Sequence, residues 1–165
     1  NQGVNKAVFM EAVMIQMTWM GAPTIYYGDE AGVCGFTDPD SRRTYPWGHE
    51  DQELLSFHRD IIRLRRENNE LRTGSLKYLD SDYNYLAYGR FHKDGQCLIL
   101  INNNDHPITR RVFVWELGIP KVGKVRTLIQ TDEGGYHLNG QEYEVNAGKI
   151  MIELPKTSAV ILKGV

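Results

Sequence analysis

The residues of this sequence whose types could do chemistry gather in one charged segment, residues 29–47. That segment holds all of the following charged residues: Asp29, Glu30, Asp38, Asp40, Arg42 and Arg43. Asp38 precedes Pro39, which favours an extended backbone, and Pro39-Asp40 suits a turn that brings Arg42 back beside Asp38. A long loop with this much charge after a strand end is more often functional than merely connecting. The alternative is a solvated surface loop whose charges pair locally.

Three elements are expected to position this loop. Residues 24–27, Thr-Ile-Tyr-Tyr, are β-branched or aromatic and lie between turn-forming residues, which predicts a short buried strand. Residues 5–20 predict a helix that is apolar almost all round and is therefore buried on several sides. Residues 52–67 place apolar side chains on one stripe behind Asp51, which is positioned to cap a second helix.

After residue 75 the hydrophobic pattern changes from helical to alternating. The expected strands are residues 76–79, 85–92, 97–101, 108–114, 125–129, 136–138, 141–145, 149–154 and 159–163. Asp94-Gly95 and Asn139-Gly140 predict tight turns, the second between the strands at 136–138 and 141–145. Many short strands with no helix among them predict an antiparallel sandwich, so residues 1–74 and 75–165 are expected to form separate units.

One strand in residues 1–74 cannot form a sheet, which leaves two interpretations. Either residues 24–27 join the sandwich, or they belong to a larger α/β body. The helix at residues 5–20 favours the second, because a helix that is apolar almost all round needs cover that one strand and one further helix cannot supply.

Composition argues against several classes of function. The 165 residues are 41% apolar and carry a formal charge of −2, without the basic excess typical of a nucleic-acid partner. No apolar run is long enough to cross a membrane, and the first residues lack the order of a signal peptide. Cys34 and Cys97 lie far apart in sequence, so two free thiols are expected, which favours a cytoplasmic location. An export signal upstream of Asn1 is the alternative that stays open.

Two motifs around the charged loop resemble a known enzyme family. Residues 21–30, Gly-Ala-Pro-Thr-Ile-Tyr-Tyr-Gly-Asp-Glu, resemble the segment on the eighth barrel strand of the α-amylase family of glycoside hydrolases. Residues 38–43, Asp-Pro-Asp-Ser-Arg-Arg, closed by Pro46-Trp47, resemble the loop that follows this strand in the neopullulanase, cyclomaltodextrinase and maltogenic amylase branch. Both motifs occur in the family's order and at its spacing, and the resemblance extends over the whole chain.

The resemblance implies an α+β fragment. Residues 1–74 would be the last part of a (β/α)8 barrel, with a helix, a strand and a helix, and residues 75–165 would be the all-β antiparallel sandwich called domain C. The parent would be a retaining hydrolase that cleaves α-glucosidic bonds in starch-like or malto-oligosaccharide substrates. No segment matches the motifs that carry the family's catalytic carboxylates, so no catalytic residue is assigned and the fragment alone is expected to be inactive. Its uncovered helix would drive self-association or fold onto the fragment's own sandwich.

Asp38 and Arg42 are the substrate-binding residues that the resemblance implies. In the family branch, the matching residues hold a glucose unit through charge-assisted hydrogen bonds to its hydroxyl groups. The alternative is an ion pair that only rigidifies the loop. Tyr45 and Trp47 are candidates either for stacking on a sugar or for anchoring the loop. Relatives often carry Pro-Met where this chain has Thr44-Tyr45, which leaves the preferred substrate open.

No metal and no cofactor are expected. The histidines lack metal-binding spacing, and residues 102–105, Asn-Asn-Asn-Asp, form only a weak calcium candidate. The alternative function is a non-catalytic carbohydrate-binding or assembly module whose sandwich acts alone. Such a module would expose coplanar aromatic side chains, and most of the available ones lie at alternating positions that predict burial: Tyr83, Tyr85, Tyr88, Phe91, Trp115, Tyr136 and Tyr143.

Overall fold

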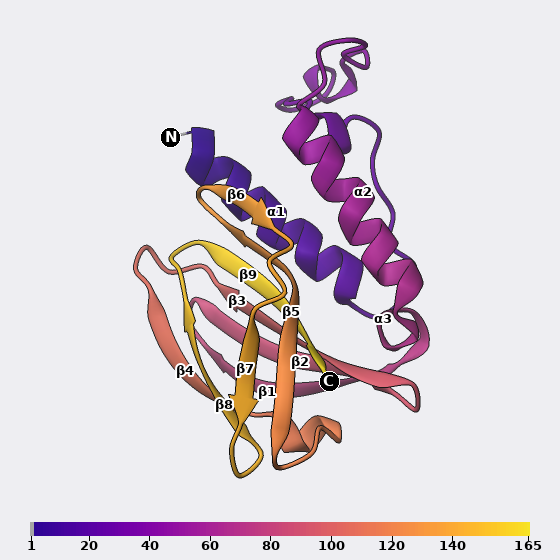
Figure 1. Cartoon of the computed structure of the whole chain (residues 1–165). Helices are drawn as coiled ribbons and strands as arrows, with labels where there is room; N and C mark the ends of the chain where they lie inside the picture. The colour runs from indigo at the N-terminus through magenta and orange to yellow at the C-terminus, as the bar shows by residue number, and fades with distance from the viewer. Residues whose placement is uncertain (1) are drawn as a thin grey trace.

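The structure is a computed structural model that describes residues 2–165. Helix α1 (Gln2–Thr18) lies against one face of a β-sheet, and helix α2 (Gln52–Glu67) packs beside α1 (Figure 1). The prediction of α2 is confirmed at both ends. Asp51 caps the helix, because its carboxylate accepts hydrogen bonds at 3.1 Å from the backbone N–H groups of Glu53 and Leu54. The short helix α3 (Asn69–Thr73) then connects α2 to the sheet.

Helix α1 is covered on several sides and leaves a narrow strip of its surface open. Met10, Met14 and Met17 recur at helical spacing and are at most 1% exposed. Val8 lies on the opposite side and is 41% exposed, whereas Trp19 follows the helix and its ring contacts that of Tyr88, with centroids 5.2 Å apart. Among residues 6–18 only Val8 and Ala12 are exposed, and α1 contacts α2, α3 and three strands of the sandwich, so the expected burial on several sides is confirmed.

The predicted strand at residues 24–27 is wrong. The segment has no regular secondary structure and joins neither sheet within the described part of the chain. A strand forms only by hydrogen bonding to a neighbouring strand, and the hydrogen bond recorded for the Thr24 carbonyl comes from the Gln16 side chain, at 2.5 Å. Tyr26 and Tyr27 are 54% and 46% exposed rather than buried. The interpretation that this segment joins the sandwich is thereby excluded.

Residues 75–164 form the predicted antiparallel sandwich. Its strands are β1 (Ser75–Asp82), β2 (Tyr85–His92), β3 (Gly95–Asn102), β4 (Ile108–Phe113), β5 (Gly123–Asp132), β6 (Gly135–His137), β7 (Glu142–Val145), β8 (Lys149–Leu154) and β9 (Ser158–Gly164). One sheet has seven strands in the order β1-β2-β3-β9-β5-β6, with β7 also pairing with β5, and the second sheet contains β4 and β8. The α+β fold class predicted from the sequence is confirmed.

One predicted hairpin is replaced by a different pairing. Asn139-Gly140 does separate β6 from β7, but these strands do not pair with each other. Both pair with β5, which spans ten residues and accommodates β7 near its start and β6 near its end. The turn at Asp94-Gly95 joins paired strands β2 and β3, as predicted.

The seven-stranded sheet separates two hydrophobic cores. One lies between this sheet and the helices and contains, among others, Met14, Phe57, Leu71, Tyr88 and Ile161. The other lies between the two sheets and contains, among others, Leu98, Val114, Val125, Ile152 and Leu162. Strand β9 contributes to both cores because successive side chains of a strand point to opposite faces. The helical unit is thus packed on the sandwich through a continuous apolar interface.

Two buried arginines join the end of α1 to the rest of the chain. Arg65 on α2 donates to the carbonyl oxygens of Met17 at 2.6 Å and Gly21 at 2.7 Å. Arg90 on β2 is 1% exposed and donates to the carbonyl of Thr18 at 2.5 Å and to that of Gly74 at 2.8 Å. These guanidinium groups satisfy carbonyls that a helix C-terminus leaves without intrahelical partners.

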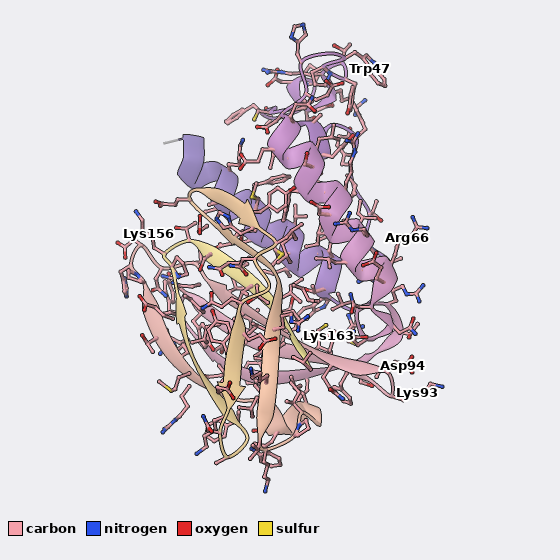
Figure 2. All side chains as sticks on the ribbon, viewed as in Figure 1. Trp47, Arg66, Lys93, Asp94, Lys156 and Lys163 are labelled. Carbon is pink, nitrogen blue, oxygen red and sulfur yellow. The ribbon has the colours of Figure 1, made fainter. Side chains whose placement is uncertain are left out.

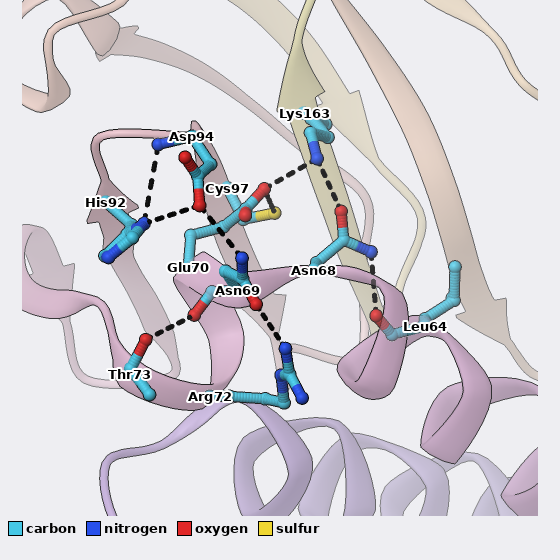
Figure 3. A network of polar contacts seen from close by, with 10 residues as sticks. All are labelled: Leu64, Asn68, Asn69, Glu70, Arg72, Thr73, His92, Asp94, Cys97 and Lys163. Atoms are coloured by element: carbon cyan, nitrogen blue, oxygen red, sulfur yellow. Dashed lines mark hydrogen bonds and ion pairs between the residues drawn. The ribbon is translucent and has the colours of Figure 1, made fainter.

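A polar network joins α3 to the sandwich (Figure 3). Lys163 on β9 lies 2.8 Å from a carboxylate oxygen of Glu70 and donates to the Asn68 side chain at 2.6 Å. Glu70 is 1% exposed. Burial alone raises the pKa of this carboxyl, but the hydrogen bond and charge of Lys163 outweigh that effect and hold the pKa below its usual value.

Cys34 is exposed and Cys97 is buried, and both are free thiols, as predicted. No helix in the described part of the chain is long and apolar enough to cross a membrane.

Candidate substrate-binding loop

The charged loop begins with a compact turn at residues 28–32. Gly28 adopts a left-handed backbone with φ of 92°, and the 3-10 helix Asp29–Ala31 follows it. The carboxylate of Glu30 accepts a hydrogen bond from the N–H of Gly28 at 3.1 Å. A side chain at Gly28 would also meet Val33, whose nearest atom lies 2.9 Å from an added Cβ. Glu30 and Gly28 therefore define how the loop leaves the segment before it.

Asp38 and Arg42 are brought together as their spacing predicts. The Nε atom of Arg42 lies 2.8 Å from one carboxylate oxygen of Asp38, and its Nη2 atom donates to the other at 3.4 Å. The side chains of Arg42 and Asp38 are 71% and 62% exposed. A pair so open to water contributes little to stability, and its remaining donors and acceptors face solvent.

A second, neighbouring ion pair holds the loop in shape. Arg43 donates to the carboxylate of Asp40 from Nε at 2.8 Å and from Nη2 at 3.0 Å. Asp40 also accepts from the N–H of Phe36 at 2.9 Å, and the carbonyl of Arg43 accepts from the Tyr27 hydroxyl at 2.9 Å. The Arg43 guanidinium, together with the Phe36 N–H, holds the pKa of the Asp40 carboxyl below its usual value.

The two pairs therefore differ in their surroundings. The Asp40 carboxylate also accepts from the backbone N–H of Phe36, and the backbone carbonyl of Arg43 accepts from the Tyr27 hydroxyl. The Asp38 and Arg42 side chains bind each other and are more than half exposed. The sequence alone did not distinguish the roles of the two pairs. The sequence did contain a signal for the second pair, because Asp40 and Arg43 are three residues apart, a spacing at which side chains on a helical turn can meet, and a short 3-10 helix (Asp40–Arg42) forms there.

Two aromatic residues lie at the end of the loop. The rings of Tyr45 and Trp47 have centroids 4.5 Å apart at an interplanar angle of 49°. Trp47 is 80% exposed and is placed at the tip of the loop beyond α2 (Figure 2). Within the part of the chain that the structure describes, no group of His, Cys, Asp or Glu side chains is arranged to hold a metal ion.

The aromatic candidates of the sandwich do not share one surface. Tyr85 and Tyr88 are 2% and 1% exposed and lie in the two cores. Tyr83 is 97% exposed in the turn between β1 and β2, whereas Trp115 is 50% exposed in the 3-10 helix Val114–Leu117. Phe91, Tyr136 and Tyr143 are partly buried against the cores, so five of the seven candidates contact a core but only two of the seven are fully buried.

The fold and the loop define a helical unit that carries an all-β domain of the kind found in α-amylases. Residues 77–165 match the family described as alpha amylase, C-terminal all-beta domain, and the chain belongs to the α-amylase family. The resemblance stated from the loop motifs is thereby confirmed, as is its branch, since neopullulanases and cyclomaltodextrinases are among the homologues.

Two relatives show which members of the family the chain is similar to. It is 36% identical over 154 residues to an amylopullulanase of Thermoanaerobacter thermohydrosulfuricus, covering 92% of this chain and 10% of the relative. It is 38% identical over 120 residues to neopullulanase 2 of Thermoactinomyces vulgaris, covering 70% of this chain and 20% of the relative. The chain thus spans a fifth or less of these relatives.

A solved structure supports the fold independently. The α-amylase of Geobacillus thermoleovorans, determined in complex with acarbose, superposes with a TM-score of 0.81 at 24% identity. The match covers 95% of this chain and 33% of that protein, so the helices and the sandwich keep a similar mutual arrangement there.

Proposed function

We propose that this chain is the C-terminal part of an enzyme that hydrolyses α-glucosidic bonds in starch-like or malto-oligosaccharide substrates, and that Asp38 and Arg42 bind one glucose unit. The main support for the binding role is the geometry of this pair. The Arg42 Nε atom lies 2.8 Å from a carboxylate oxygen of Asp38, and both side chains are more than half exposed. The amylopullulanase and neopullulanase names of the relatives support the substrate class.

The chemistry of the pair suits neighbouring hydroxyl groups of a sugar. A carboxylate offers only acceptors and a guanidinium only donors, so together they can bind hydroxyls in both of their roles. Such bonds are strengthened because one partner carries a full charge. Binding of a hydroxyl-rich ligand also requires no change in the backbone, because the neighbouring pair of Asp40 and Arg43 already fixes the loop.

The bond-breaking groups are proposed to come from outside these 165 residues. A retaining glycosidase needs a carboxylic acid that is protonated and a second carboxylate about 5 to 5.5 Å away. Asp38 and Asp40 each form an ion pair with an arginine. The Arg43 guanidinium lowers the pKa of the Asp40 carboxyl, which makes Asp40 a poor general acid. The proposed roles of the two carboxylates are therefore binding and loop structure, not acid catalysis.

Alanine substitution in the full enzyme tests the binding role. Arg42→Ala and Asp38→Ala are each expected to lower kcat/KM for malto-oligosaccharides about ten- to a hundredfold, because about 1.5 to 3 kcal/mol of charged hydrogen bonding is lost. The melting temperature should change little. Arg43→Ala is the matched control and should act mainly on stability. If Arg42→Ala lowers the melting temperature and leaves kcat/KM unchanged, the pair is structural and the proposed binding role is wrong.

The purified 165-residue chain tests where the catalytic groups lie. It is expected to release no reducing sugar from starch, pullulan or cyclodextrin, because no segment of its sequence matches the motifs that carry the family's catalytic carboxylates. Activity above that of a heat-inactivated sample would overturn this part of the proposal.

A further inference from the structure

Lys6 on α1 binds two carboxylates at the place where the charged loop ends. Its ammonium nitrogen lies 2.7 Å from a carboxylate oxygen of Asp51 and 2.9 Å from one of Glu53. Asp51 caps α2, and Glu53 lies in the first turn of that helix. Figure 1 shows the loop at the start of α2, beyond the sandwich. Lys6 therefore joins α1 to the point at which the loop becomes helix.

The two ends of the loop meet at this same point. The backbone N–H of Asp51 donates to the carbonyl of Ala31 at 3.0 Å, which closes the segment of residues 32–50. The ends also pack closely, because a Cβ atom added at Gly32 would lie 3.0 Å from the Cβ atom of Asp51. We call Ala31, Gly32 and Asp51 the loop stem. Lys6 thus binds a residue of the stem directly.

The two oxygens of the Asp51 carboxylate have separate partners. Oδ1 accepts the hydrogen bonds from the N–H groups of Glu53 and Leu54 that cap α2, whereas Oδ2 binds Lys6. The hydrogen bond to Asp51 raises the pKa of the Lys6 ammonium. Burial alone raises the pKa of the Asp51 carboxyl, but the hydrogen bond from Lys6 and those from the backbone outweigh burial and hold this pKa below its usual value. Both groups are therefore charged at neutral pH, and the cap does not depend on Lys6.

The rest of the loop is bonded mainly to itself. Among residues 2–165, the hydrogen bonds and ion pairs of residues 33–49 reach only partners within residues 27–50. The orientation of the loop on the body of the chain is therefore set at its stem. The side chains of Lys6 and Asp51 are 29% and 30% exposed, so water and salt screen their attraction less than that of an open surface pair.

We propose that Lys6 is a positioning residue for substrate binding, which holds the loop stem so that Asp38 and Arg42 meet the sugar in one orientation. This inference rests on the proposed function, because it requires Asp38 and Arg42 to bind substrate. Lys6 itself does not touch the sugar in this role. A rotation at the stem displaces the distant Asp38 and Arg42 side chains, and a displacement of about 1 Å is enough to lower a reaction rate about a hundredfold.

Steady-state kinetics of the full enzyme with maltoheptaose test this role. Lys6→Met removes the charge but keeps a long side chain, and it is expected to lower kcat/KM about three- to thirtyfold, mainly through a higher KM. The melting temperature should change little, because the cap of α2 stays in place. Lys6→Arg keeps the charge and should restore kcat/KM to within about twofold of the parent enzyme. Lys77→Met is the matched control and should leave kcat/KM unchanged, since Lys77 forms a similar ion pair with Glu116, at 3.1 Å, on the sandwich.

A double-mutant cycle shows whether Lys6 acts through the sugar-binding pair. The variant Lys6→Met/Arg42→Ala should lose no more kcat/KM than Arg42→Ala alone, because an oriented loop has no value once its guanidinium is gone. Losses that multiply would overturn the inference, and so would unchanged kinetics in Lys6→Met beside an impaired Arg42→Ala. Neither result would touch the proposed function, which fails separately if Arg42→Ala leaves kcat/KM unchanged.

Hydrogen exchange in the 165-residue chain measures the stem itself, independently of activity. The backbone amides of Gly32 and Asp51 should exchange faster in Lys6→Met than in the parent chain, because the stem opens more often without the ion pair. The amide of Leu98, on the central strand β3, should exchange as in the parent chain. Unchanged exchange at Gly32 and Asp51 would show that Lys6 does not hold the stem and would overturn the inference.

Discussion

Glu11 is a buried acid without a partner, on the face of α1 that packs on the sandwich. It is 4% exposed, and its Oε1 atom makes no hydrogen bond within residues 2–165. Burial raises the pKa of the Glu11 carboxyl to about 8 from an ordinary value of 4.5. The folded chain therefore keeps this group protonated at neutral pH, whereas the unfolded chain ionises it.

This difference predicts a stability that falls with rising pH. Between about pH 4.5 and pH 8 the folded state binds a proton that the unfolded state has released, so the free energy of unfolding declines across that window. Glu11→Gln should remove this decline and should be more stable than the parent chain at about pH 8, by about 1 to 3 kcal/mol. Urea unfolding at several pH values measures the effect. Glu67→Gln, at an exposed position of α2, is the control, and an unchanged pH dependence in Glu11→Gln would contradict the prediction.

At the scale of elements, the end of α1 depends on groups that are distant in sequence. Arg65 on α2 and Arg90 on β2 donate to its last carbonyls, at 2.6 Å to Met17 and at 2.5 Å to Thr18. The helix has no basic residue of its own in its last turn. The sandwich thus supplies part of the helix C-cap, and the two units stabilise each other.

Removing one of these arginines should loosen the junction. Arg90→Met is expected to lower the free energy of unfolding by about 1 to 3 kcal/mol, because the buried carbonyls of Thr18 and Gly74 lose their donors. Hydrogen exchange should rise in the last turn of α1. Arg63→Met provides the control, since the Arg63 side chain is 56% exposed and pairs with Asp60 on the same helix. Equal stability of Arg90→Met and the parent chain would show that the guanidinium is dispensable.

At the scale of the whole molecule, apolar surface remains open around α1 and the segment that follows it. Val8 is 41% exposed, Met20 57% and Tyr26 54%. The structure folds one face of α1 onto the chain's own sandwich, yet this second surface has no cover within residues 2–165. Each large apolar side chain left in water forgoes about 1.5 to 3 kcal/mol of burial.

The 165-residue chain is therefore expected to self-associate through this surface. Sedimentation velocity should show a mass that rises with concentration, and the double variant Val8→Lys/Met20→Lys should shift the chain towards monomer. Met151→Lys, on the distant β8 strand and 59% exposed, is the matched control. A clean monomer that binds the dye ANS strongly would contradict the prediction.

Local sequence was sufficient for the elements whose hydrogen bonds and apolar contacts are close along the chain. The periodicity of α2 and its Asp51 cap specify that helix, because capping and the apolar stripe involve neighbours within one or two turns. Alternation and turn residues likewise predict the strands of the sandwich. The i,i+4 spacing around Pro39 was enough to place Arg42 beside Asp38.

Contacts between distant residues decided the rest. Residues 24–27 have the composition of a strand but form none here, because a strand requires a pairing partner and none lies beside them in the described chain. The pairing of both β6 and β7 with β5, the capping of α1 by Arg65 and Arg90, and the ion pairs of Lys6 with Asp51 and Glu53 each join residues far apart in sequence. Such contacts depend on how sheets and helices pack, which only the tertiary structure determines.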